Sequence, residues 1–110
     1  MKKFLLILFT LLITAISLLA VGLAWDPSPD PNVTGYAIYY GTNSGSYQTR
    51  VNVGNVTNCV ITVPTDGHTW YFVATAYTID GVESLPSNEV SYAPPYKIQP
   101  PRNFSVLSVK

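Results

Sequence analysis

The side chains that could catalyse a reaction are few and scattered along the chain. Among 110 residues there is one histidine, His68, and one cysteine, Cys59. A catalytic histidine needs a nucleophile and an orienting partner, but His68 follows Gly67 in an expected turn. Cys59 alternates with Ile61 on an apolar strand face, which predicts a buried thiol and not a reactive one. We therefore expect no enzyme activity, no catalytic residue and no cofactor.

Carboxylates are the other groups that could do chemistry or bind a metal ion. A calcium site needs a dense run of oxygen ligands, such as Asp-x-Asp-x-Asp, and the sequence has no such run. All but Glu89 fall in expected loops, where hydrogen bonding within the loop is the ordinary role, as we expect for Glu83 and its neighbour Ser84. No metal site is predicted. The six carboxylates are Asp26, Asp30, Asp66, Asp80, Glu83 and Glu89.

Tyrosines form the best candidate for a binding surface. Tyr71 and Tyr77 share one side of an expected strand over residues 70–77, and Tyr39 lies on the outer side of another over residues 35–40. If these strands are neighbours, the three side chains occupy one sheet face. Tyrosine offers a large contact area at low entropic cost, which suits a protein or sugar ligand. The alternative is cross-strand aromatic pairing that only shields the sheet.

The stretch from Trp70 to Tyr77 indicates how these side chains are positioned. It has no charge, glycine or proline and lies between the turn signals Asp66-Gly67 and Asp80-Gly81. Its alternation predicts a central antiparallel strand with one buried face. Further short strands separated by turns predict a β-sandwich. The six expected strands are residues 21–25, 35–40, 47–53 (an edge strand carrying Arg50), 58–63, 70–77 and 89–92.

These strands resemble a fibronectin type III domain of the bacterial and phage secreted type, over residues 21–93. The resemblance implies an all-β, immunoglobulin-like antiparallel β-sandwich with a role in extracellular binding or scaffolding. Its core would contain Leu23, Trp25, Tyr36, Ile38, Trp70 and Phe72. The motifs that resemble the family are Val21-x-Leu23-x-Trp25-Asp26-Pro27, Gly35-Tyr36-x-Ile38-Tyr39-Tyr40-Gly41, Gly67-x-x-Trp70-x-Phe72-x-Ala74-x-Ala76 and Asp80-Gly81-x-Glu83-Ser84-x-Pro86-Ser87-Asn88-Glu89-Val90.

One departure from the family concerns the corner before the strand at residues 70–77. The family usually has Leu, Pro-Gly and then a Tyr whose hydroxyl forms the corner hydrogen bond. This sequence has Pro64, Asp66-Gly67 and Trp70 at those places. An indole N–H in place of a phenol hydroxyl changes the reach of that bond.

The N-terminus predicts export. Two lysines follow Met1, and residues 4–24 are uncharged and almost wholly apolar. A signal peptide is favoured over a membrane-anchor helix, because the small residues Ala15 and Ser17 suit cleavage after Ser17. The expected organisation is a signal or anchor helix at residues 1–17, the fibronectin-like domain at 18–93 and a tail at 94–110. The location would be extracellular, or membrane-anchored if the segment stays uncleaved.

The tail contains a second departure from the family. Residues 94–101 are rich in proline and read as an extended linker. From Asn103 to Val109 the sequence is strand-like and resembles the family's first strand, which is absent before Val21. Three hypotheses follow. The segment is the start of a second domain in a longer ancestral chain, it folds back to fill the vacant edge, or it fills that edge in a neighbouring molecule.

Together these patterns predict an exported, non-enzymatic β-sandwich that serves as a protein-interaction or spacer module at a cell or virion surface. Net charge is zero, which argues against nucleic-acid binding. The alternatives are an accessory carbohydrate-binding domain that uses Tyr39, Tyr71 and Tyr77, and a structural subunit that self-associates by donating Asn103 to Val109. The expected partner is a protein or a glycan, with membrane contact only through an uncleaved N-terminal segment.

Overall fold

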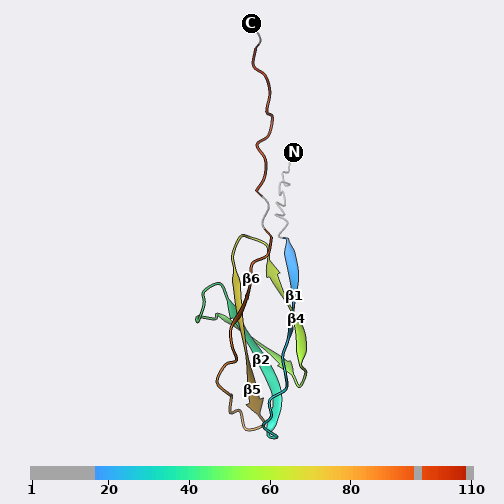
Figure 1. Ribbon diagram of the computed structural model, residues 1–110, viewed down its shortest axis with the longest axis vertical. Coiled ribbons are helices and arrows are strands. Elements are labelled where there is room, and N and C mark those ends of the chain that lie inside the picture. The colour runs from blue at the N-terminus through green and yellow to red at the C-terminus, as the bar shows by residue number, and fades with distance from the viewer. Residues whose placement is uncertain (1–16, 96–97, 109–110) are drawn as a thin grey trace, which may run out of the picture.

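A computed structural model describes residues 17–95 and 98–108 of the chain. These residues form two antiparallel sheets, one with the order β1-β4 and one with the order β3-β2-β5-β6 (Figure 1). The predicted antiparallel β-sandwich and its six strands are confirmed. The predicted N-terminal helix lies outside the described residues. The strands are β1 (Leu18–Ala24), β2 (Val33–Gly41), β3 (Thr49–Gly54), β4 (Asn58–Pro64), β5 (Trp70–Thr78) and β6 (Val90–Tyr92).

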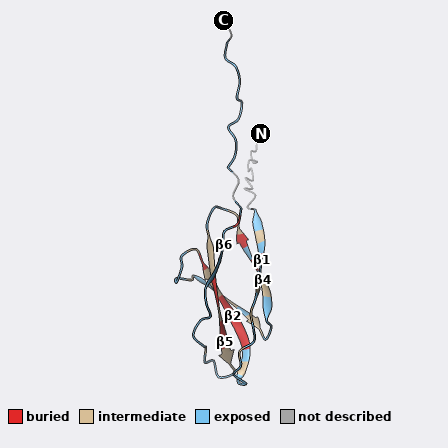
Figure 2. Cartoon of the chain, in the orientation of Figure 1, coloured by how far each residue is buried: buried red, intermediate tan, exposed pale blue. Residues whose placement is uncertain are grey.

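The core lies between the two sheets and is built from the alternating inward side chains of both. Figure 2 colours the chain by burial and shows a buried stretch, in red, along β2. Ile38 and Phe72, at 1% and 2% exposure, come from the larger sheet, and Val63 of β4 faces them with no exposed surface. Val21 and Ile61 complete the buried cluster. Of the other residues assigned to the core from the sequence, Tyr36 is buried, whereas Leu23, Trp25 and Trp70 are half-buried.

Strand β5 is central in its sheet, but the prediction that only one of its faces is buried is wrong. Phe72 and Ala76 are buried on the core side, while Val73 and Thr75 are buried on the opposite side, at 6% and 7% exposure. The reason is that the loop over residues 79–89 packs along this outer face, where Glu83 bonds to Thr75. Period-two alternation within the strand cannot reveal that the loop following it turns back over this face.

The corner before β5 is held differently from the family's usual arrangement. The indole nitrogen of Trp70 is buried and has no hydrogen-bond partner among the described residues. Instead, the backbone N–H and the hydroxyl of Thr65 both donate to the carbonyl oxygen of Ser17, at 3.0 and 3.2 Å. The residue preceding β1 therefore takes part in closing this end of the sandwich.

The tail does not complete the fold within its own chain. Residues 98–108 form no strand and are exposed, and they extend away from the sandwich (Figure 1). The hypothesis that this segment folds back to the vacant edge is not what the structure shows for the part up to Ser108, and Val109 lies outside the described residues. Within the described ranges, no helix is long and apolar enough to cross a membrane.

Candidate functional site

Two serines hold the loop that precedes β6 against β5. The backbone N–H of Ser84 donates to the Ala76 carbonyl at 2.8 Å, and the Ala76 N–H donates to Ser84 Oγ at 2.9 Å. Ser87 repeats this pair of bonds with Ala74, at 2.8 and 2.9 Å. The serine hydroxyls thus replace the carbonyls that an edge strand would supply, and they fix the position of Glu83, which forms an isolated bridge with Tyr77.

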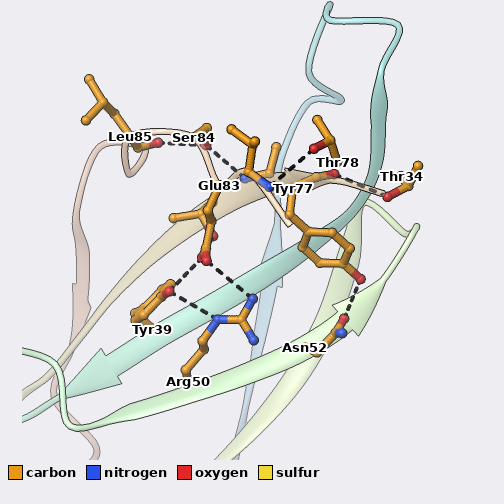
Figure 3. Close-up of polar contacts among 12 residues, drawn as sticks. Thr34, Tyr39, Arg50, Asn52, Tyr77, Thr78, Glu83, Ser84 and Leu85 are labelled. Atoms are coloured by element: carbon orange, nitrogen blue, oxygen red, sulfur yellow. Dashed lines mark hydrogen bonds and ion pairs between the residues drawn. The ribbon is translucent and has the colours of Figure 1, made fainter. Parts of the chain in front are cut away.

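Glu83 joins side chains from three strands on the outer face of the larger sheet (Figure 3). Its Oε2 accepts hydrogen bonds from Tyr39 at 2.6 Å and from Thr75 at 2.5 Å. Its Oε1 lies 3.5 Å from the guanidinium of Arg50. Arg50 in turn donates from Nε to the Tyr39 hydroxyl at 3.1 Å. The cluster Tyr39–Arg50–Thr75–Glu83, here called the Glu83 cluster, matches the loop-stabilising role expected for Glu83.

The electrostatics of the Glu83 cluster favour a structural role. The Thr75 hydroxyl, and after it the Tyr39 hydroxyl and the Arg50 guanidinium, hold the pKa of Glu83 below its ordinary value. The hydrogen bond to Tyr39 chiefly raises the pKa of Arg50. A glutamate that works as a general acid at neutral pH needs a raised pKa. Glu83 is instead a fixed carboxylate that orders the outer face.

A second carboxylate, Glu89, connects the hairpin turn after β2 to the start of β6. Its Oε1 accepts from Ser44 Oγ at 2.6 Å, and its Oε2 accepts from the Gly45 N–H at 3.0 Å and from the Tyr47 hydroxyl. The Ser44 hydroxyl is the largest cause of a lowered pKa at Glu89, and the hydrogen bond to Glu89 raises the pKa of Tyr47. Sequence reasoning missed this contact, since its partners lie more than forty residues apart.

An open groove of about 350 Å³ lies on the outer face beside the Glu83 cluster. Val73 and Thr75 of β5 line it together with aromatic rings from β2 and from the turn that follows it. This outer groove lies on the face singled out from the sequence. The residues that line it are Tyr39, Tyr47, Val73, Thr75, Glu83, Ser84 and Pro86.

The three tyrosines proposed as a ligand face are on the same side of the sheet but do not form one cluster. Tyr39 pairs with Val73, whereas Tyr71 pairs with Gly41 and Tyr77 with Gly35. Tyr71 is therefore diagonal to Tyr39, and Tyr77 lies four residues beyond Val73, roughly 13 Å along the strand. Of the three, only Tyr39 lines the outer groove.

Tyr77 has a structural environment of its own. Its hydroxyl donates to Asn52 Oδ1 at 2.7 Å (Figure 3). Its ring lies against Gly35, where an added Cβ would collide with the phenol oxygen and ring carbons. Tyr47, which the sequence did not single out, lines the groove, whereas Tyr71 and Tyr77 do not. Its sequence signal, a tyrosine next to the turn at residues 41–46, was too weak to indicate this.

The remaining candidate residues have local roles. His68 Nδ1 lies 2.9 Å from Asp66 Oδ1, and the His68 interaction lowers the pKa of that carboxyl. Cys59 is half-buried, and burial raises the pKa of its thiol. Within the described residues, no group of three or more His, Cys, Asp or Glu side chains is placed to hold a metal ion.

The chain is similar to part of one curated protein, a Kelch domain-containing protein from Saccharolobus solfataricus. The two sequences are 38% identical over 87 residues, which is 79% of this chain and 11% of the relative. The chain thus spans about a tenth of the length of the curated protein that it matches. No family model matches the chain, and no solved structure is detectably similar to it.

Proposed function

We propose that the chain is an exported, non-enzymatic β-sandwich of the fibronectin type III kind that acts as a protein-interaction or spacer module at a cell or virion surface. The strand order supports the family assignment. In the family, the second and fifth strands form one sheet and the remaining later strands form the other. The observed sheets, β1-β4 and β3-β2-β5-β6, have the same arrangement. Only the family's first strand lacks a counterpart among the described residues.

The observation that supports an interaction role most directly is the outer groove. Two tyrosines and Pro86 give it rigid apolar walls, and the bound carboxylate of Glu83 gives it a fixed acidic rim. Rigid aromatic walls beside a small number of fixed polar groups are typical of protein contact sites. The proposed partner is a protein segment with an apolar side chain for the floor at Val73 and a donor group for the rim.

The curated relative supports the description of the chain as a module. Most of this chain matches about a tenth of a much longer protein, so a similar segment occurs there beside a large amount of other sequence. A propeller blade is a single four-stranded sheet, whereas this chain packs a two-stranded sheet against a four-stranded one. The word Kelch in the relative's name therefore does not describe the architecture found here.

Export is tested by producing the full chain in a bacterial host and sequencing the N-terminus of the protein recovered outside the cytoplasm. The proposal expects a mature N-terminus at Leu18, so the bonds from Thr65 to Ser17 belong to the uncleaved chain only. Recovery of the chain in the cytoplasm alone, with Met1 intact, would contradict export. Cleavage within β1, for instance after Ala24, would contradict the proposed boundary, because it would remove the strand that pairs with β4.

Binding through the outer groove is tested with a photo-reactive residue in place of Tyr47 on cells that display the chain. The control places the same residue at Val56, an exposed position in the turn between β3 and β4. A protein adduct that forms from position 47 and not from 56 is the expected result. Adducts of equal yield from both positions would mean that the groove has no special role, and the spacer interpretation would then be favoured.

A carbohydrate ligand remains the second candidate, because Tyr39 and Tyr71 present half-exposed rings on one face. A glycan array distinguishes it from the protein hypothesis. Binding that is lost in Tyr39→Ala and Tyr71→Ala would support a sugar site. Tyr77→Ala serves as a comparison, since Tyr77 is engaged with Asn52 and Gly35. Absence of glycan binding by the parent chain would exclude this candidate.

A further inference from the structure

Strand β1 has one open edge. It pairs with β4 from Leu18↔Pro64 to Ala24↔Asn58. Hydrogen bonds at both ends, from Thr65 to Ser17 and from Trp25 to Thr57, show that the odd-numbered residues face β4. In an antiparallel pair the intervening residues point their N–H and C=O groups the other way. The residues whose backbone groups point away from β4 are Leu18, Ala20, Gly22 and Ala24, and no strand among the described residues lies on that side of β1.

This edge lacks the features that usually prevent one strand from pairing with another molecule. Natural edge strands carry charges, prolines or bulges, and β1 has no charge, no proline and an unbroken register. By contrast, the edge strand β3 carries Arg50, and β4 ends at Pro64. Three of the four outward positions of β1 hold small residues, and the fourth, Leu18, is 62% exposed. No charged side chain of β1 therefore opposes a second strand along this edge.

A cavity lies at the side of the sandwich that this edge borders. Its volume is about 100 Å³, and its lining is mainly apolar. Leu23 and Trp25 at the end of β1, Ile38 and Phe72 from the core, and Val90 of β6 contribute to the wall. β6 is only three residues long, so the larger sheet does not cover this side. A strand added to β1 would place side chains over the opening.

The tail has the features of the strand that is missing. Residues 98–108 lie away from the sandwich (Figure 1), with a bend at Arg102 and Asn103 where the backbone of Asn103 is left-handed, so pairing would require Asn103 to straighten. Phe104 and Val106 would share one face of a strand, and they are 95% and 77% exposed. Residues 103–108 carry no charge. The same chain thus has an uncharged segment with exposed apolar side chains and an uncharged edge with no described strand beside it.

Strand direction decides whether the tail fills the edge of its own molecule or of another. Leu18 pairs with Pro64 and Tyr92 pairs with Trp70, and Pro64 and Trp70 are joined by only five residues. The tail therefore leaves from the end of the sandwich where β1 begins. A tail that folded back would run parallel to β1. A tail that continued outward would meet β1 of a second copy, stacked in the same orientation, in the antiparallel direction.

We propose that the open edge of β1 binds residues 103–108 of a second copy of this chain as an antiparallel strand, with Phe104 or Val106 covering the cavity beside Leu23. Every strand pair among the described residues is antiparallel, and antiparallel pairing is slightly more stable per residue. Residues 93–102 can span at most roughly 33 Å, which is enough to reach an adjacent copy. Such a contact is heterologous, so repeated use builds a row of molecules. The proposal does not depend on export or on the outer groove.

The test uses two full-length chains produced together. The acceptor chain carries a photo-reactive residue in place of Ala20 and the substitution Val106→Leu, which marks its own tail by one methylene in mass spectrometry. The donor chain has the natural sequence. The expected adduct joins position 20 to a peptide from residues 98–108 with the unmarked mass. Attachment to the marked tail alone, attachment elsewhere, or no adduct would overturn the proposal.

Two pairs of variants define the contact on each side. Gly22→Pro in the acceptor removes an outward N–H and is expected to lower the adduct yield about tenfold. Val60→Pro, at the cross-strand partner of Gly22, removes the matching N–H from the far edge of β4 and should leave the yield unchanged.

Because Gly22→Pro could unfold the acceptor, Phe104→Asp in the donor supplies an independent test at a position outside the sandwich. Loss of yield with Phe104→Asp but not with Arg102→Asp is expected. Equal yields from these two donors would overturn the proposal.

Discussion

At the scale of single residues, one carboxylate organises most of the outer face. Glu83 bonds to Tyr39 of β2, to Thr75 of β5 and to Arg50 of β3. A carboxylate accepts such bonds well only when ionised, and charge-assisted hydrogen bonds are stronger than neutral ones. The side chain is 28% exposed, so water weakens but does not abolish the effect. The bonds that lower the pKa of Glu83 are the same bonds that hold the loop on β5.

Replacing Glu83 by Gln should destabilise the fold and flatten its response to acid. The folded-state pKa of Glu83 is lowered. Its stabilising contribution is therefore complete above the ordinary glutamate pKa of about 4.3 and is lost as the pH falls through the lower folded value. Glu83→Gln should cost roughly 1–2 kcal/mol at neutral pH, and less at acid pH. Urea unfolding at several pH values measures both quantities.

The control for this prediction is Asp80→Asn, which removes an exposed carboxylate three residues away in the same loop. It should change the free energy of unfolding by less than about 0.5 kcal/mol. If Glu83→Gln and Asp80→Asn have equal effects, or if the cost of Glu83→Gln persists unchanged in acid, the assigned role of the ionised carboxylate is wrong.

Gly35 is a residue whose small size the structure requires. A Cβ at this buried position would overlap the phenol of Tyr77. Gly35→Ala should destabilise the domain by about 1–3 kcal/mol and break the bond from Tyr77 to Asn52. Because Tyr77→Leu removes the colliding atoms, the cost of Gly35→Ala should shrink in that background. Thermal unfolding of the double-mutant cycle measures the coupling, and Gly22→Ala, with open space around it, should be nearly neutral.

At the scale of elements, the loop before β6 acts as an irregular extension of the sheet. Ser84 and Ser87 each supply one acceptor and one donor to β5. Removal of one hydroxyl leaves one β5 amide without its partner, which costs about 1 kcal/mol. We expect Ser84→Ala to speed hydrogen exchange at Ala76 and Ser87→Ala to speed it at Ala74. Ser91→Ala, on exposed β6, should change neither amide. Uniform acceleration at both amides in each variant would contradict separate roles.

The strands and most of the core could be predicted from the sequence because their signals are local. Alternation and turn residues placed β5 within one residue of its observed bounds, and they put Ile38 and Phe72 inside. Burial of Val73 and Thr75 could not be predicted, because alternation within β5 does not show that the following loop turns back over them. The outer groove was not predicted, although one of its lining residues, Tyr39, had been placed on that face. Tyr39 belongs to a periodic strand, whereas Tyr47 depends on a bond to Glu89 across 42 residues.

At the scale of the whole molecule, the sandwich is unequal. Its larger sheet has four strands and its smaller sheet has two. A two-stranded sheet is marginal on its own, so β1 and β4 depend on packing of Val21, Ile61 and Val63 against the larger sheet. A third strand on β1 would bury part of the cavity wall and satisfy the outward backbone groups of β1. An added strand would therefore stabilise the smaller sheet more than the larger one.

If that strand comes from a second copy, stability must depend on protein concentration. A partner that binds only the folded state raises the unfolding midpoint as its concentration rises. For a domain of this size, about 1 kcal/mol of added stability corresponds to a rise of roughly 4–8 °C. We expect the midpoint of the natural chain to rise across a hundredfold dilution series followed by calorimetry, and the midpoint of Phe104→Asp to stay constant. Arg102→Asp, a change of charge just before the strand-forming residues, should keep the dependence. If the unfolding midpoint of the natural chain does not vary with concentration, no strand of a second copy binds the smaller sheet in solution, and the proposal is wrong.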